Sequence, residues 1–137
     1  MEKAAASLSY AVRPVVLRYY LSRLSLMLGV LTAVPFAAAL LLGEQSLAGD
    51  LAITIGLLLS IWLPGRRDAA PRKLQVNEAL VVVALTFLLA PVFLLPAFVG
   101  QGLSITDALF ESISAFTTTG LSTVSQVHDF SPGLLLL

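Results

Sequence analysis

Apolar residues along this chain gather in three long runs separated by short polar stretches. Leu24 to Gly43 carries no charged side chain, a second run ends at Pro64, and Ala79 to Gly100 is again uncharged. A bilayer core needs about 20 apolar residues at about 1.5 Å of rise each. The first and third runs are therefore each predicted to cross a membrane, and Pro91 and Pro96 are expected to bend the second half of the third.

The second run is shorter than the other two. Its continuous apolar part extends from Leu51 to Pro64, so it reaches membrane length only if it starts near Leu47 and includes Asp50. We predict a short, tilted or partly sheltered helix here. Trp62 lies at its far end, which is the place of an interfacial anchor.

A short amphipathic segment follows the third run. In Ser104-Ile-Thr-Asp107 a serine is followed three residues later by an acid, which predicts a helix N-cap of capping-box type. The helix should run to about Ala115, roughly 12 residues, which is too short to span a bilayer. Ile105, Leu109 and Ile113 repeat on one of its faces.

Two interpretations of this helix stay open. It is either an amphipathic loop helix at the membrane interface or a pore helix that enters the membrane. A pore helix would aim its C-terminal carbonyl groups at the membrane centre, where their partial negative charge favours a cation.

Three threonines and a glycine follow the helix directly, in Phe116-Thr-Thr-Thr-Gly120. Because β-branched residues disfavour helix and Gly120 can adopt positive φ, this pattern predicts an extended return path whose backbone carbonyls face a dehydrated cation. The alternative is a helix end with glycine at the C′ position. That alternative accounts for the glycine but not for three β-branched polar residues among apolar spans.

Two acids of the short helix, Asp107 and Glu111, are spaced four residues apart. They could form a paired-carboxylate site, but an acid near a helix N-terminus has an ordinary structural role. We therefore interpret Ser104, Asp107 and Glu111 as support for the pore helix. Glu111 lies deeper than Asp107 and is expected to need a buried partner.

Composition agrees with a membrane protein. The chain of 137 residues is 58% hydrophobic and 12% charged, with mean hydropathy +0.94, against about 45–50% apolar and about 25% charged residues in soluble domains. Its net charge of zero argues against a nucleic-acid partner. The absence of cysteine excludes disulfides and thiolate chemistry, and one histidine, His128, leaves little room for a transition-metal site.

No catalytic motif is present that would make the chain an enzyme. His128 and Asp129 are adjacent and serines flank them, but the sequence has no Gly-x-Ser-x-Gly nucleophile elbow. We expect no enzymatic activity and no cofactor, and we interpret residues 125–131 as a polar outer loop.

Basic residues predict the orientation in the membrane. Residues 1–23 and the loop Gly65–Lys73 are both rich in lysine and arginine, and two crossings separate them. Both are therefore expected in the cytoplasm, with the turn Gly43–Asp50 outside. The threonine–glycine stretch would then be entered from the outer face of the cell (inner) membrane, as a pore loop requires.

These residues resemble the Trk/Ktr/HKT superfamily of potassium transporters, and its TrkH type in particular. The resemblance rests on Trp62-Leu-Pro-Gly-Arg-Arg67, on Leu95-Pro96-Ala-Phe98, and on Thr106-Asp107-Ala-Leu-Phe-Glu111-Ser-Ile-Ser114 leading into Phe116-Thr-Thr-Thr-Gly120. It covers the chain from about Leu24. Residues Asn77 and Ala79 depart from the family, which often has a basic residue and a glycine there.

The resemblance implies an all-α multi-pass membrane fold with helix–pore loop–helix repeats in pseudo-fourfold symmetry around one pore. After a cytoplasmic segment at 1–23, residues 24–64 would be two leading transmembrane helices. Residues 65–78 would be a basic cytoplasmic linker. Residues 79–131 would be the first outer helix, pore helix and filter loop, and residues 132–137 the start of a truncated next helix.

Potassium ligands are also implied by the resemblance. The carbonyls of Thr118 and Thr119 would bind K⁺, with Thr117, Gly120 and Leu121 beside them, so that the chain supplies one quarter of a selectivity filter. Family members with serine at the position of Gly120 favour sodium, so a glycine there favours potassium.

The implied partners are the lipid bilayer, the remaining repeats of a full-length transporter, a second copy in a homodimer, and a cytosolic nucleotide-binding regulatory subunit of the TrkA type near Arg66–Lys73. With one Thr-Thr-Thr-Gly string, the chain is interpreted as a fragment or truncated form of a potassium transporter, and the resemblance includes symporters. The alternative is a small structural or accessory membrane protein without its own pore.

Overall fold

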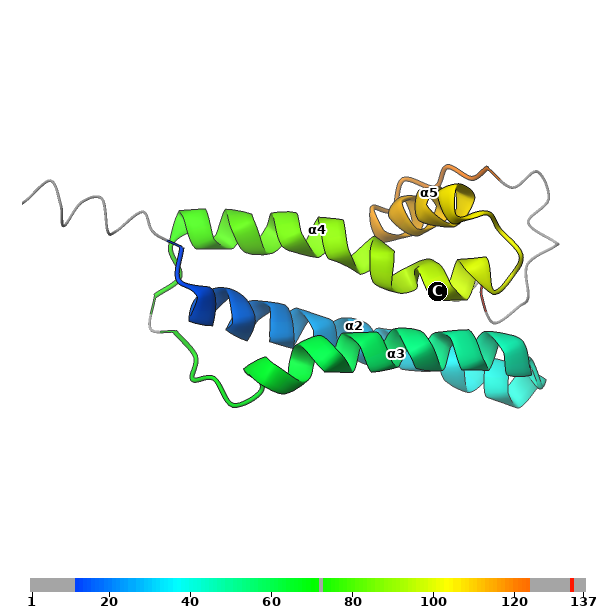
Figure 1. Cartoon of the computed structure of the whole chain (residues 1–137), viewed down its shortest axis with the longest axis horizontal. Helices are drawn as coiled ribbons and strands as arrows, with labels where there is room; N and C mark the ends of the chain where they lie inside the picture. The colour runs from blue at the N-terminus through cyan, green and yellow to red at the C-terminus, as the bar shows by residue number, and fades with distance from the viewer. Residues whose placement is uncertain (1–11, 72, 124–133, 135–137) are drawn as a thin grey trace, which may run out of the picture.

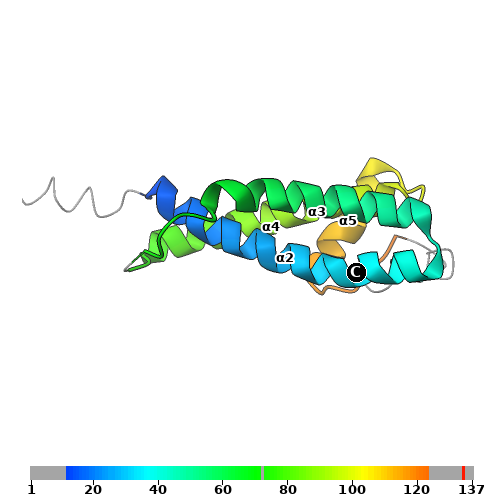
Figure 2. The same cartoon turned by 90° about the horizontal axis from the view of Figure 1, so that it is seen from below.

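The computed structural model describes residues 12–71, 73–123 and 134. This part of the chain contains α2 (Pro14–Leu42), α3 (Gln45–Gly65), α4 (Val76–Val99) and α5 (Ile105–Phe116). Helices α2 and α3 form an antiparallel hairpin, α4 lies alongside it, and α5 folds back on the far end of α4 (Figures 1 and 2). The predicted all-α class is confirmed. The predictions for residues 1–11, for the outer loop with His128 and for most of residues 132–137 lie outside the described residues.

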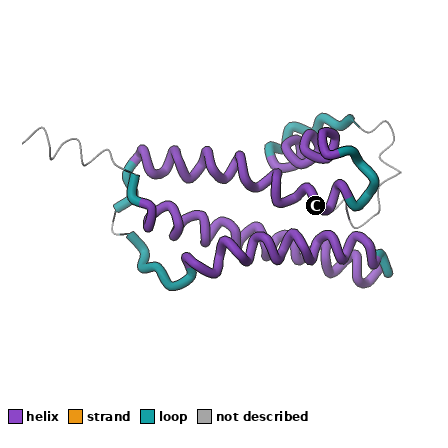
Figure 3. The backbone as a smooth tube through the Cα atoms, in the orientation of Figure 1, coloured by secondary structure: helices purple, strands orange, loops and turns teal. Residues whose placement is uncertain are grey.

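Three of the helices are long and apolar enough to cross a membrane, as predicted. Helices α2, α3 and α4 each contain an 18-residue stretch of high mean hydropathy, with values of 2.2, 1.8 and 2.6 respectively. Helix α2 begins at Pro14, well before the uncharged run that starts at Leu24, because proline's fixed φ suits the first helical turn. Helix α3 begins at Gln45 and includes Asp50, which is how it reaches the length of a span. Helix α4 turns in its second half, which contains Pro91 and Pro96 (Figure 3).

An ion pair joins the first residues of α2 and α4. The Arg13 side chain donates from Nε to Oε1 of Glu78 at 2.6 Å and from Nη2 to Oε2 at 2.8 Å. Nη2 of the same arginine also donates to the Lys73 carbonyl, and the Gln75 backbone N–H donates to Glu78 Oε2. The Glu78 side chain is completely buried. The pair therefore fixes how α4 docks on the hairpin.

A second ion pair lies at the same end. Arg18 donates from Nε and Nη2 to the two carboxylate oxygens of Asp68, each at 2.7 Å. The structure thus brings residues 13–23 together with residues 65–71 and 73, and we call this the basic end. The opposite end, with the α2–α3 turn at Gly43 (φ 74°), is the turn end. That the basic end faces the cytoplasm stays a prediction.

The α2–α3 hairpin is tightest at Gly65. A Cβ atom there would lie 2.5 Å from the Ser22 Cβ and 2.6 Å from the Arg18 carbonyl oxygen. The Ser22 hydroxyl donates to the Trp62 carbonyl across the same contact. Small residues allow such close approach between membrane helices.

Replacing Gly65 with alanine is expected to destabilise the hairpin by about 1–3 kcal/mol, because backbone and side chain would both have to shift. Gly56→Ala in the same helix is the matched control, since no atom lies within 4 Å of a Cβ at that position. Thermal unfolding in detergent measures both. Equal unfolding temperatures for the two variants would show that the contact at Gly65 is unimportant.

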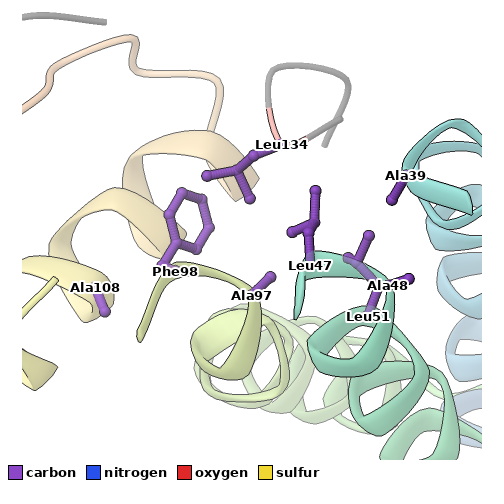
Figure 4. Packing of buried hydrophobic residues seen from close by; sticks show 8 residues of the cluster. All are labelled: Ala39, Leu47, Ala48, Leu51, Ala97, Phe98, Ala108 and Leu134. Carbon is purple, nitrogen blue, oxygen red and sulfur yellow. The ribbon is translucent and has the colours of Figure 1, made fainter. Parts of the chain in front are cut away.

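The apolar core lies at the turn end, where all four helices meet. Its buried residues come from the α2–α3 turn region, from the end of α4, from α5 and from position 134 (Figure 4): Ala39, Leu47, Ala48, Leu51, Ala97, Phe98, Ala108 and Leu134. Asp50 borders this core and packs closely on Gly100. A Cβ atom added at Gly100 would lie 1.7 Å from Oδ2 of Asp50. This core positions α5.

Candidate functional site: the re-entrant helix and its return loop

Helix α5 is re-entrant. It begins at the turn end beside the last residues of α4 and runs back toward the middle of the bundle, and residues 117–123 then return toward the turn end (Figure 1). The helix has 12 residues, so it is too short to cross a membrane. Because both its entry and its exit lie at one end of the bundle, its geometry agrees with the pore-helix interpretation, and that α5 enters a membrane stays a prediction.

Ser104 begins this helix as predicted. Its hydroxyl oxygen accepts a hydrogen bond from the Asp107 backbone N–H at 3.2 Å. The hydroxyl also donates to Asp107 Oδ2 at 2.6 Å, so the carboxylate is held by the serine side chain. An acid in the first turn also interacts favourably with the helix dipole.

The polar face of α5, not its apolar stripe, is turned inward. Ala108 and Ser112 are fully buried and Glu111 is 7% exposed. Ile105 and Ile113, by contrast, are exposed. The buried side therefore consists of small and hydrogen-bonding groups that can hold a neighbouring backbone, and the apolar stripe is left to face lipid or further helices.

The helix ends in a Schellman motif that is followed by the return loop. The Thr119 N–H donates to the Ser114 carbonyl at 3.0 Å, and the Thr118 N–H donates to the Ala115 carbonyl at 3.1 Å. The C′ residue of this motif is Thr118, with φ 54°. A β-branched residue in the left-handed region is strained, and such strain concentrates at functional sites.

The alternative of a simple helix end with glycine at C′ is therefore wrong. Gly120 has φ 72°, but it lies two residues beyond the C′ position. The backbone at Thr117 (φ −86°, ψ 1°) and Thr118 forms a turn, so an extended path does not begin directly after the helix as the sequence suggested. A Cβ atom added at Gly120 would have no atom within 4 Å, so crowding does not require glycine there. The positive φ of Gly120 is what favours glycine at this position.

Three consecutive carbonyl groups of the loop are available to a ligand. The Thr117 carbonyl accepts from the Thr118 hydroxyl, and the Leu121 carbonyl accepts from the Ser114 hydroxyl. Within residues 12–71 and 73–123, no hydrogen bond reaches the carbonyl oxygens of Thr118, Thr119 or Gly120. The predicted best ligands are thus among the free carbonyls, whereas those of Thr117 and Leu121 already accept bonds.

Glu111 ties the return loop to the helix. Its Oε1 accepts from the Thr123 backbone N–H at 2.6 Å, from the Thr123 hydroxyl at 3.0 Å and from the Ser122 hydroxyl at 2.8 Å. The partner of Glu111 is therefore the loop itself, although Ser122 and Thr123 are exposed and not buried as the sequence suggested. Sequence reasoning missed Ser122 and Thr123, although two hydroxyl residues directly after the Thr-Thr-Thr-Gly string are a usable signal.

Asp107 and Glu111 do not act as a pair. Asp107 is bonded to Ser104, and Glu111 to the far side of the loop. The described residues contain no group of three histidine or acidic side chains that could hold a metal ion. The return loop instead presents backbone carbonyls, a kind of ligand that suits a weakly hydrated monovalent cation.

Two known proteins are similar to this chain. It is 34% identical over 121 residues to the Trk system potassium uptake protein TrkI of Halomonas elongata, covering 85% of this chain and 24% of that protein. It is 29% identical over 111 residues to an uncharacterized cation transporter of Methanocaldococcus jannaschii, covering 79% of this chain and 23% of that protein. The chain thus spans about a quarter of the curated relatives that it matches. No family model matches the chain, and no solved structure matches it.

Proposed function

Because these two matches support a Trk-type transporter family for this membrane protein, we propose that it takes part in cation transport and supplies one wall of a potassium-selective pore. The observation that carries the proposal is the run of free carbonyls at Thr118, Thr119 and Gly120, held at the end of a re-entrant helix. Carbonyl oxygens arranged in this way replace the hydration shell of a potassium ion.

The helix and its loop provide the electrostatics for such a site. The C-terminal carbonyls of α5 carry partial negative charge, which favours a cation beside Thr117–Gly120. The Glu111 carboxylate, bonded to the exit of the loop, adds negative charge on the same side. No lysine or arginine occurs anywhere from residue 74 to the last residue, so nothing in that stretch opposes a cation.

One such loop supplies only a quarter of a filter. In this proposal the other walls come from the remaining repeats of a transporter, of which this chain is the first part. The exposed apolar side chains of α5 support that arrangement, since Ile105 is 72% and Ile113 44% exposed. A homodimer, a cytosolic regulatory subunit at the basic end and a location in the cell inner membrane belong to the same proposal.

Replacing Gly120 with serine tests the proposal. We expect the preference for K⁺ over Na⁺ to fall about tenfold, equivalent to about 1.4 kcal/mol, because a side chain alters the carbonyl geometry at φ 72°. The measurement is competitive uptake of K⁺ and Na⁺ by vesicles that contain the chain assembled with its remaining repeats.

Gly102→Ser is the matched control for this experiment. Gly102 has φ 88° and also no atom within 4 Å of a Cβ, but it lies before the pore helix. It should carry the same backbone strain and leave ion preference unchanged. Equal ion preference in the two serine variants would contradict the proposal and favour an accessory membrane protein without a pore.

A further inference from the structure

Four cationic side chains at the basic end form no ion pair with any acid that the structure describes. All eight lysines and arginines of the chain lie in residues 1–23 and 66–73. Among the described residues the two ion pairs use Arg13 and Arg18. The remaining described cations are exposed and make no ion pair in that part of the chain: Arg23, Arg66, Arg67 and Lys73. The basic end therefore carries a surplus of positive charge that the described part of the chain does not neutralise.

Two of these arginines are held over aromatic rings. The guanidinium of Arg23 lies 5.2 Å from the centre of the Tyr19 ring, and that of Arg66 lies 5.5 Å from the centre of the Trp62 ring. Tyrosine and tryptophan favour the level of lipid headgroups. Ring contacts of this kind hold the guanidinium near that level while leaving its N–H groups free to bind an anion.

An apolar cavity begins just inside this end of the bundle. It has a volume of about 230 Å³ and lies between α2, α3 and α4. Its lining includes Leu21 and Ile61, the neighbours in sequence of the Ser22–Trp62 contact. It extends along the helices to Leu28, Ala90 and Phe93. A volume below the roughly 300 Å³ of ordinary ligand pockets suits one unbranched chain better than a compact ligand.

We propose that the basic end binds an anionic phospholipid, with one acyl chain in this cavity and the headgroup phosphate on Arg23 and Arg66. Guanidinium groups bind phosphate oxygens through paired, charge-assisted hydrogen bonds. A free phosphate would use the arginines but not the cavity, and a zwitterionic lipid would not need the unpaired charge. Ile61 lines the cavity and is the sequence neighbour of Trp62, which holds Arg66, so an anionic lipid would use both the apolar cavity and the positive charge.

The single tryptophan of the chain makes this site measurable. Trp62 lies beside the cavity residue Ile61 and under Arg66. The protein is reconstituted into vesicles of unlabelled phosphatidylcholine. An increasing fraction of one test lipid is added, either brominated phosphatidylglycerol or brominated phosphatidylcholine. Brominated acyl chains quench tryptophan fluorescence on contact. We expect phosphatidylglycerol to reach half-maximal quenching at a several-fold lower fraction than phosphatidylcholine.

Charge variants separate the headgroup from the chain. Arg23→Gln with Arg66→Gln should remove the preference for phosphatidylglycerol, and Arg23→Lys with Arg66→Lys should retain most of it. Ala90→Leu, which fills the cavity, should weaken quenching by both lipids, whereas Val83→Leu on the exposed side of α4 should not. Circular dichroism checks that each variant keeps its helices.

Three results would overturn the proposal. They are equal quenching by the two brominated lipids, a phosphatidylglycerol preference that survives the double glutamine variant, and displacement of the lipid by inorganic phosphate. The last would show a free-anion site in place of a lipid site. Because the assay measures no transport, its outcome does not depend on whether the chain forms part of a pore.

Discussion

Glu111→Ala is expected to reduce potassium transport by at least tenfold. The substitution removes the acceptor of three hydrogen bonds from Ser122 and Thr123, so the return loop loses its attachment to α5. Hydrogen bonds to a charged group contribute about 1.5–3 kcal/mol each. The combined contribution of two such hydrogen bonds exceeds about 1.4 kcal/mol, the free energy that corresponds to a tenfold change in transport. Rubidium uptake into vesicles measures the effect, and circular dichroism should show that the helices remain.

Asp107→Asn is the matched control. It also neutralises an acid of α5, but Asp107 is bonded to Ser104 at the start of the helix and not to the loop. We expect it to reduce transport far less than Glu111→Ala, and Glu111→Gln to lie between the two because an amide oxygen can still accept. Equal losses for Asp107→Asn and Glu111→Ala would mean that the charge of the helix matters and the attachment of the loop does not.

Glu78→Gln is expected to cause the largest loss of stability among substitutions at the basic end. The Glu78 side chain is completely buried and accepts from both side-chain donors of Arg13 and from two backbone N–H groups. A neutral amide at this position places an N–H₂ group against donors, and the half-exposed Arg13 guanidinium loses its buried counter-charge. We expect α4 to detach from the hairpin at lower temperature, measured by thermal unfolding in detergent.

The exposed pair at this end provides the comparison. Hydrogen bonds from Arg18 hold the pKa of Asp68 below its usual value. A carboxyl with a lowered pKa stabilises the folded protein above its ordinary pKa of about 4 and loses that effect as the pH falls further. At pH 7 Asp68→Asn therefore removes a formed but solvent-exposed ion pair, which contributes little. A larger loss for Asp68→Asn than for Glu78→Gln would contradict the account of how α4 is docked.

Much of the fold could be predicted because the signals are local. An uncharged run of about 20 residues indicates a membrane span by itself, and the segments that pack against it need not be known. Ser104 and Asp107 indicate the start of α5 by their spacing alone, and the structure confirms that Ser104 caps the helix. The prolines at 91 and 96 likewise indicate the bend of α4 from their own chemistry.

The contacts that fix the site could not be predicted because their partners are distant or unusual. Arg13 and Glu78 are 65 positions apart, and no periodicity connects them. Glu111 was expected to need a partner, but nothing in a helical pattern indicates that the loop behind it supplies one. The left-handed residue at the helix end is Thr118, whereas local preference favours glycine, so no local signal indicates a Schellman motif closed by a threonine.

Potassium protection of a single cysteine tests most directly whether this loop lines a cation path. The chain has no cysteine, so Thr119→Cys introduces one reactive thiol at a free carbonyl position, and Thr106→Cys introduces one at an exposed position in the first turn of α5. In the assembled transporter, made otherwise cysteine-free, a small methanethiosulfonate reagent is added with K⁺ or with choline. The account predicts that K⁺ slows modification at position 119 several-fold and does not affect position 106. Equal rates at position 119 with and without K⁺ would contradict it.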